Sequence, residues 1–226
     1  MEKLKKGMLT VFAVAILIIP IVSIAGDLEP PGPPGPAMRT LDEIYNKLDQ
    51  LRNPAPVGKT GQTVSYGTGD DGDWEKGAAW PNPRFTDNGN GTVTDNLTGL
   101  IWLKNANCFG SRGWAQALVD CSNLANGSCG LSDGSTAGDW RLPNVKELQS
   151  LIHYGVYSPA LPNTVGTGKW SNGDPFTNVQ SLYYWSSTTN AGNTSSAWYV
   201  HMYYGYVYIG NNKDYSYYVW PVRGGN

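Results

Sequence analysis

Short apolar runs alternate with polar, glycine-rich stretches over most of the chain after residue 57. Residues 84–95 carry strand-like alternation on both sides of an Asn-Gly pair, which predicts a β-hairpin. Leu100–Leu103 is an apolar run that predicts a further strand. Beyond residue 152 come short strands rich in Tyr, Trp and Val. The pattern therefore predicts a domain with many short antiparallel strands.

Two stretches have the spacing of amphipathic helices instead. Residues 114–124 place apolar side chains three or four apart, and residues 143–152 do the same behind Asn144, which we expect to cap the helix. The buried faces are predicted to hold Trp114, Ala117, Leu118 and Cys121 in the first helix, and Val145, Leu148, Leu151 and Ile152 in the second. Helices combined with antiparallel strands indicate an α+β fold.

Residues 1–25 have the pattern of an export signal. Lys3, Lys5 and Lys6 precede an apolar run from residue 8 to 24, and the small residues of Ser23-Ile24-Ala25 stand before Gly26. The alternative is an uncleaved anchor helix, because the run approaches the length that spans a membrane. Both interpretations predict that the remaining chain is exported, to the medium or the cell surface of a bacterium.

The next segments predict a spacer followed by a self-associating helix. Residues 26–37 contain a short collagen-like stretch with Gly at every third position and Pro between. In residues 38–53, Thr40 and Glu43 form a capping box, and a heptad seam follows at Leu41, Ile44, Leu48 and Leu51. We expect a short parallel bundle, with a trimer favoured; the alternative is a helix packed on its own domain. Residues 57–226 are the predicted ligand-binding domain.

Composition narrows the class of protein further. The 16 basic and 18 acidic residues nearly cancel, which argues against nucleic acid as a partner. Cys108, Cys121 and Cys129 allow one disulfide, which export permits. With two histidines and no Cys-x-x-Cys pair, we expect neither a zinc site nor a cofactor. The acidic turns at residues 70–73 and 87–95 could ligate a structural calcium ion, although such turns commonly serve only as turns.

Several motifs of the domain together resemble one family. They are Phe85–Asp95 with Thr98–Trp102, then Gly138–Asn144 with Glu147-Leu148, then Tyr184–Thr188, Ala197-Trp198 and Pro221–Gly225. The family that they resemble is the Lcl C-terminal domain family, and the resemblance covers roughly residues 84–226. It implies a C-type-lectin-like fold, an extracellular binding role as in collagen-like adhesins, and in some members affinity for sulfated glycans. It also implies a Cys108–Cys129 disulfide. Trp220 stands where many members have a second arginine, which weakens the case for an anionic glycan.

The tail of the domain has the composition of a contact surface. Ten of the 14 tyrosines lie between residues 183 and 218, mixed with Asn, Ser and Gly, as in antibody contact loops. We expect Trp185, Trp198, Val200, Val207, Val219 and Val222 to form scaffold. We expect an extracellular glycan or protein to contact Asn190, Asn193, Ser195, His201, Tyr203, Tyr204, Tyr208, Asn211, Asn212, Asp214, Tyr215, Ser216, Tyr218 and Trp220.

The same tail resembles the variable region of proteins diversified by retroelements, several of which use a C-type-lectin-like fold. Adenine changes in AAY codons yield Asn, Asp, Ser, Gly, Thr, Tyr and His, which are common in residues 189–218. A fixed lectin surface of similar composition is the alternative.

Two other classes of function compete with binding. An enzyme of the formylglycine-generating type uses C-terminal cysteines, and this chain has none after Cys129. No catalytic triad or carboxylate pair is indicated either, so we expect no enzyme. A purely structural coat or spacer would not account for the aromatic tail.

Overall fold

The computed structural model describes residues 40, 41, 44, 57–209 and 212–224. The chain divides into two units, Met1–Ala55 and Pro56–Asn226. The predicted signal, the spacer and most of the predicted helix over residues 38–53 lie outside the described residues. Leu41 and Ile44 are helical, and the Ile44 N–H donates to the Thr40 carbonyl at 3.0 Å. Within the described residues, no helix has the length and apolar character that a membrane span requires.

The first sheet joins the start of the domain to its end. It contains β1 (Phe85–Asp87), β2 (Thr92–Asp95), β3 (Ile101–Leu103) and β9 (Val222–Arg223), in that order and all antiparallel. The predicted hairpin is confirmed, since β1 and β2 pair and the Asn88 N–H donates to the Thr92 carbonyl at 3.0 Å. Trp102 is the partner of Val222, so the last strand closes against the third.

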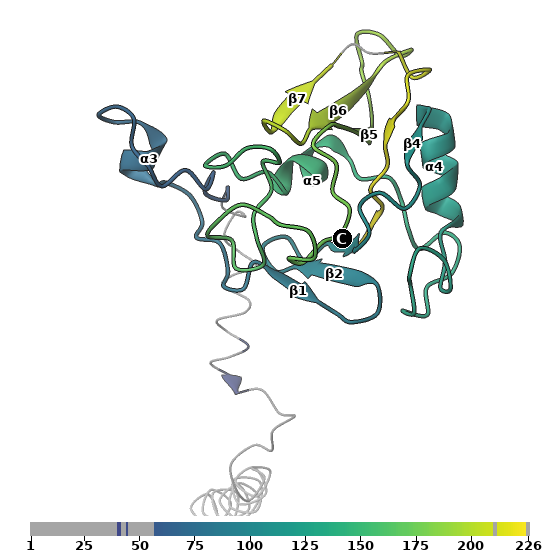
Figure 1. Cartoon of the computed structure of the whole chain (residues 1–226), viewed down its shortest axis with the longest axis horizontal. Coiled ribbons are helices and arrows are strands. Elements are labelled where there is room, and N and C mark those ends of the chain that lie inside the picture. The colour runs from purple at the N-terminus through teal and green to yellow at the C-terminus, as the bar shows by residue number, and fades with distance from the viewer. Residues whose placement is uncertain (1–39, 42–43, 45–56, 210–211, 225–226) are drawn as a thin grey trace, which may run out of the picture. The chain divides into compact units, whose positions relative to one another are not determined.

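The second sheet carries most of the tail. Its order is β4 (Ser111–Arg112), β8 (Tyr217–Tyr218), β5 (Tyr183–Thr189), β6 (Ala197–His201) and β7 (Tyr206–Tyr208). Figure 1 shows β5, β6 and β7 side by side. Only the β5–β8 pairing is parallel in these two sheets. Three short helices are described: α3 (Asp71–Trp74), α4 (Trp114–Asn123) and α5 (Val145–Ser150). This confirms an α+β fold, while the C-type-lectin-like assignment stays a prediction.

The two predicted helices are present, and the second is shorter than expected. Asn144 caps α5 by accepting the N–H groups of Lys146 and Glu147, and the Glu147 carboxylate accepts the Asn144 N–H in return. The helix ends at Ser150, because the Ile152 N–H donates to Gln149 three residues back and tightens the last turn. The apolar side chain of Ile152 is nevertheless buried, as predicted.

Alternation along β5 sends neighbouring side chains into two different hydrophobic clusters. Tyr184 joins a cluster that includes Trp102 of the first sheet and Leu148 of α5. Trp185 points to the opposite face, where Ala117 and Cys121 of α4 cover it. Both faces of the second sheet are therefore buried in part, and α4 covers only some of the outer face.

The cysteines pair as the resemblance implied. Cys108 and Cys129 form a disulfide with their Cα atoms 5.7 Å apart, which confirms that prediction. Cys121 is free and buried on α4, and burial raises the pKa of its thiol. The disulfide joins the segment after β3 to the loop that follows α4.

Candidate ligand-binding surface

Strand register collects tyrosines on the outer face of the second sheet. Tyr183 pairs with His201 across β5 and β6, and Tyr199 pairs with Tyr208 across β6 and β7. Cross-strand partners point to the same side of a sheet, so these rings lie together. We use the name tyrosine face for Tyr183, Tyr199, His201, Tyr206, Tyr208 and Tyr217, with Tyr203, Tyr204 and Tyr215 from the adjoining turns.

The rings of the tyrosine face form an unbroken series of contacts. The Tyr183 and His201 ring centroids are 4.5 Å apart, and Tyr199 stacks on Tyr208 at 5.8 Å. Further pairs are His201–Tyr204 (6.0 Å), Tyr203–Tyr204 (4.3 Å), Tyr204–Tyr206 (5.3 Å), Tyr199–Tyr217 (4.9 Å) and Tyr215–Tyr217 (6.4 Å). Such contacts hold each ring in place before a ligand arrives, which lowers the entropy lost on binding.

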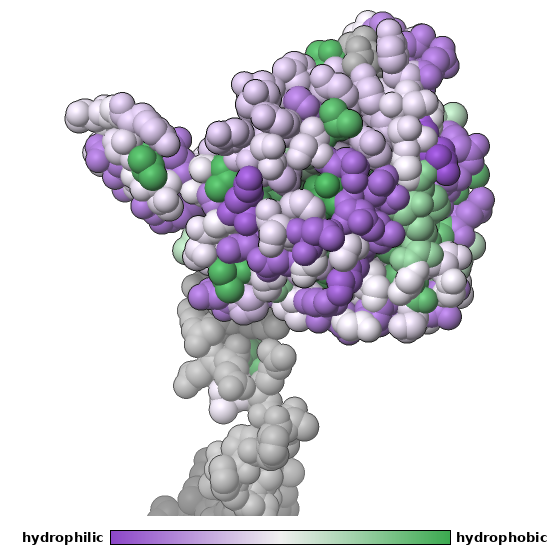
Figure 2. Space-filling model, viewed as in Figure 1, coloured by the Kyte–Doolittle hydropathy of each residue, from purple (hydrophilic) through white to green (hydrophobic). Residues whose placement is uncertain are grey.

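The tyrosine face has a buried base and an exposed rim. Tyr199 and Tyr217 are buried, while Tyr204, Tyr206, Tyr208 and Tyr215 are exposed to solvent, Tyr206 to 50%. The surface over β7 and the neighbouring turn is pale in Figure 2, as expected for tyrosine, which is neither strongly hydrophilic nor strongly hydrophobic. Rings supported from below and open above are suited to contact with a partner.

Three titratable groups of this face have pKa values that are shifted toward the uncharged form. Burial, helped by the neighbouring Tyr217, Tyr183 and Tyr208, raises the pKa of Tyr199 to about 12. The pKa of Tyr204 is also raised, chiefly by the adjacent Tyr203 hydroxyl. Burial lowers the pKa of His201, so its imidazole is uncharged at neutral pH. The face therefore offers rings and hydroxyls without net charge.

The ammonium group of Lys213 already has two partners within the domain. Lys213 donates to the Thr189 hydroxyl at 2.9 Å, and its ammonium lies 3.9 Å from the centroid of the Trp114 ring. A ligand anion would have to compete with both contacts for this cation.

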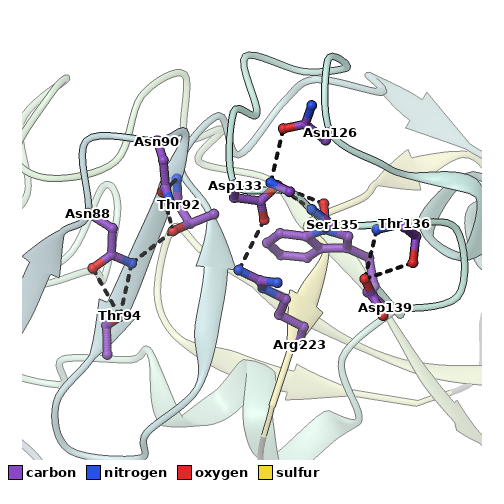
Figure 3. A network of polar contacts seen from close by, with 12 residues as sticks. Asn88, Asn90, Thr92, Thr94, Asn126, Asp133, Ser135, Thr136, Asp139 and Arg223 are labelled. Atoms are coloured by element: carbon purple, nitrogen blue, oxygen red, sulfur yellow. Dashed lines mark hydrogen bonds and ion pairs between the residues drawn. The ribbon is translucent and has the colours of Figure 1, made fainter.

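Arg223, in the closing motif of the chain, is likewise held inside the structure. Figure 3 shows it extending from the last strand to Asp133, whose fully buried carboxylate lies 3.0 Å from the guanidinium. Its guanidinium also lies 5.1 Å from the centroid of the Trp140 ring. Asp133 in turn accepts from Ser135, and Thr136 is bonded to Asp139 in the same loop. Arg223 therefore fixes this loop to β9 and leaves little charge for a ligand.

A shallow depression adjoins the tyrosine face at Tyr203. Its volume is about 450 Å³, and it is lined by Gly155, Val156, Tyr157, Ser158, Lys169 and Tyr203. The Tyr157 and Tyr203 rings of this lining have their centroids 6.2 Å apart. Lys169 is exposed, and no ion pair of this lysine is present among the described residues. Lys169 could therefore pair with an anionic group of a ligand.

The structure places the predicted contact residues in two turns and the strands between them. Ser196 bridges to Asn212, which brings the turn at residues 190–196 beside residues 212–216. Exposed members of the predicted set are Asn193, Ser195, Tyr204, Tyr208, Asn212, Asp214, Tyr215 and Ser216; half-buried members are Asn190, His201, Tyr203 and Tyr218. Asn211 lies outside the described residues. Tyr218 packs toward Tyr184 on the inner face, away from the tyrosine face.

Trp220 is a correction to the predicted set. Its side chain is completely buried, packs on Phe176 at 4.9 Å and donates its indole N–H to the Leu103 carbonyl at 2.8 Å. The reason is that a ring of this size gains more by filling the core than it could on the surface. The residue that replaces a family arginine is therefore part of the scaffold.

The scaffold prediction holds for most of its members. Trp185, Val200, Val219 and Val222 are fully buried, whereas Trp198 and Val207 are half-buried. Sequence reasoning left Tyr183, Tyr199, Tyr206 and Tyr217 out of the contact set. The signal that could have found them is the spacing of two in Tyr199/His201 and Tyr206/Tyr208, which places both members of each pair on one face of a strand.

The acidic turns use their carboxylates internally. Asp95 forms a buried bidentate pair with Arg84 at 2.8 and 3.0 Å, and Asp87 is paired with Lys104 at 2.6 Å. The Asp70 carboxylate accepts the backbone N–H groups of Tyr66 and Asp73. Among the described residues, no group of three or more metal-ligating side chains is placed to hold an ion.

The described residues after position 57 form an α+β domain with an open aromatic surface. The model of the Lcl C-terminal domain matches residues 91–223, and the chain belongs to that family. Membership of this family indicates a surface or adhesin-like role. Comparison with curated proteins gave no match, and neither did comparison with solved structures.

Proposed function

We propose that this protein is an exported adhesion or recognition protein whose tyrosine face binds an extracellular glycan or protein. The observation that carries the proposal is the continuous series of ring contacts that runs from Tyr203 through Tyr199 to Tyr215. This series is open to solvent along Tyr204, Tyr206 and Tyr208. Tyrosine supplies a large amphipathic contact area with few rotatable bonds, which suits both kinds of ligand.

The charges favour a ligand that is neutral over most of its contact area. The tyrosine face is uncharged, and Lys213 and Arg223 are engaged within the domain. A densely sulfated chain requires several free cations, because each sulfate gains most from its own counter-charge. Lys169 beside Tyr203 could match one isolated anionic group.

The binding test compares variants that differ only in surface chemistry. The protein is applied to glycan and cell-surface protein arrays, and the best ligand is titrated against Tyr206→Ser, Tyr206→Phe and Val119→Ser. We expect Tyr206→Ser to weaken binding roughly tenfold or more, because exposed aromatic anchors dominate contact energies. Val119 on α4 is also 50% exposed, so Val119→Ser is a control matched in exposure. Equal affinities for all variants would refute the tyrosine face as the site.

The proposal includes genetic variability of the tail. Its support is the separation of roles in residues 183–222, where Trp185, Val200 and Val219 are fully buried and the turns expose Tyr, Asn and Ser side chains, among them Asn193, Ser195 and Tyr204. Substitution at the exposed positions would change the contact surface without disturbing the core. A nearby near-copy of the 3′ end that differs only at adenines, beside a reverse transcriptase gene, is the expected genomic finding. Absence of both would leave a fixed lectin surface.

Export and self-association complete the proposal. The disulfide, the family and the signal-like first 25 residues all suit an extracellular protein. Several copies on one bundle would multiply weak contacts into firm attachment. An enzyme is not proposed, because the formylglycine-generating alternative lacks its C-terminal cysteines. Light scattering of the mature chain tests the oligomer, and a monomeric mass would refute it.

A further inference from the structure

A small lobe at the start of the domain has no core of its own. It comprises residues 62–76 and includes α3, which stands away from the two sheets in Figure 1. None of its residues is buried. A segment without buried apolar surface lacks the main source of folding free energy, so its order must come from elsewhere.

Polar contacts define the shape of this projecting lobe. The Asp70 carboxylate accepts the Tyr66 N–H at 2.7 Å, the Asp73 N–H at 3.0 Å and the Gln62 side-chain amide at 3.1 Å. At the base, Thr60 is hydrogen-bonded to Asp71. Each such bond in solvent contributes only about 1 kcal/mol net. The lobe is thus well defined in shape but weakly stabilised within one chain.

Close backbone packing shows that the shape is specified by the sequence. A Cβ atom at Gly72 would meet the Val64 carbonyl oxygen at 2.2 Å, so only glycine permits this approach. The packing leaves the large apolar side chains outside. Tyr66 is 85% exposed, Trp74 is 59% exposed, and Val64 is exposed as well; Figure 2 shows strongly hydrophobic atoms on the lobe surface.

We propose that the projecting lobe packs against a second copy of this chain. Trp and Tyr are the residues that most often anchor protein interfaces, and an ordered lobe that presents both needs a partner surface to cover them. The contact would supply the apolar burial that the lobe lacks within one chain.

The sequence next to the lobe points to a second copy as the occupant. The heptad seam at residues 41–51 ends only a few residues before the domain begins at Val57. Its first two members, Leu41 and Ile44, are helical and are 84% and 43% exposed in the single chain. An apolar seam of this kind is buried when parallel helices associate. Lobes placed directly after such a bundle are held close to neighbouring copies by covalent connection.

Parallel association also determines the symmetry of the contact between copies. Copies around a common axis are related by rotation, so each lobe meets the same surface of the next copy. In a trimer the two patches in contact differ, and three such contacts close into a ring. Each copy then packs its lobe against one neighbour and contacts the lobe of the other neighbour, so that every lobe is covered.

Site-specific cross-linking of the full mature chain tests this contact directly. A photoreactive benzophenone side chain is placed at position 74, and in a second protein at position 119 on α4. We expect irradiation to link chains through position 74 into covalent dimers and trimers, with little linking through position 119. Equal linking at both positions, or none at position 74, would overturn the proposal.

Substitutions in the lobe measure how much the lobe contact contributes to the stability of the oligomer. We expect Trp74→Ser with Tyr66→Ser to raise the concentration of half-dissociation about 10- to 30-fold in analytical ultracentrifugation. Val119→Ser should leave it unchanged. An oligomer that is insensitive to the lobe variants would refute the lobe contact alone. A chain that is monomeric at every concentration would refute both the bundle and the lobe contact, while ligand binding by the tyrosine face is tested separately.

Discussion

Tyrosine has two opposite roles in this domain, and position within a strand decides which one applies. Tyr184 is fully buried on the inner face of β5, where its hydroxyl accepts the Gln180 N–H at 2.9 Å. Tyr183, one residue earlier, lies on the outer face with its ring tilted against that of His201. The same type of side chain therefore lies in the core at one register position and on the proposed contact surface at the next.

Arg84 and Asp95 form a buried ion pair that connects separate parts of the domain. Both side chains are completely buried, and the guanidinium also donates to the Ser150 carbonyl at 2.8 Å. Asp95 accepts from Leu97 and Thr98 as well. The pair thus joins the first hairpin to the end of α5.

Breaking this pair should destabilise the domain strongly. We expect Arg84→Met to cost about 3–5 kcal/mol in free energy of unfolding, because Asp95 would remain buried without its counter-ion. Lys104→Met removes the cation of the partly exposed Lys104–Asp87 pair and should cost at most about 1 kcal/mol. Urea unfolding followed by tryptophan fluorescence compares the two. Similar losses in both variants would contradict the assigned role.

At the scale of elements, contacts between residues close in sequence fix the start of α5. The helix has six residues, too few to be stable alone, and its capping box supplies partners for three N–H groups at the first turn. Arg141 reinforces this turn through two bonds of 2.6 and 2.7 Å to Glu147, which raise the pKa of the guanidinium.

Removing the cap should have a measurable but moderate effect. We expect Asn144→Ala to lower the free energy of unfolding by about 1 kcal/mol, and the melting temperature by about 2–4 °C. Asn144→Asp keeps an acceptor at the same place and should remain close to the parent. Differential scanning calorimetry measures both, and an unchanged melting temperature for Asn144→Ala would rule out a stabilising cap.

At the scale of the molecule, the disulfide acts mainly on the unfolded chain. Cys108 and Cys129 are 21 residues apart, and closing a loop of that size restricts the unfolded ensemble. The bond also holds together two segments that contain little regular structure.

The double variant Cys108→Ala/Cys129→Ala should lose roughly 3 kcal/mol in free energy of unfolding. The parent protein with reductant should then unfold at the same urea concentration as the double variant, since each lacks the cross-link. Reductant should not change the double variant, whose remaining Cys121 is free. If reductant does not change the urea concentration at which the parent protein unfolds, the disulfide contributes little to stability.

The local pattern of side chains was enough to predict several features of this protein. The hairpin around residues 88–91, the strand at 101–103, the two helices and the burial of Trp185 and Val200 all follow from spacing and turn chemistry. These features depend on neighbours within a few residues, and that information is present in any short window of sequence.

The tertiary structure alone decided which tyrosines lie on the outer face of the second sheet. β8 and β9 have two residues each, too few to show a period, and they are held by distant partners in β4, β5 and β3. Trp220 was predicted to contact the ligand, yet its ring packs on Phe176 and its indole N–H donates to the Leu103 carbonyl. Composition therefore determined that the tail is a binding surface candidate. Long-range pairing determined which side chains are exposed on it, because burial depends on residues far away in the chain.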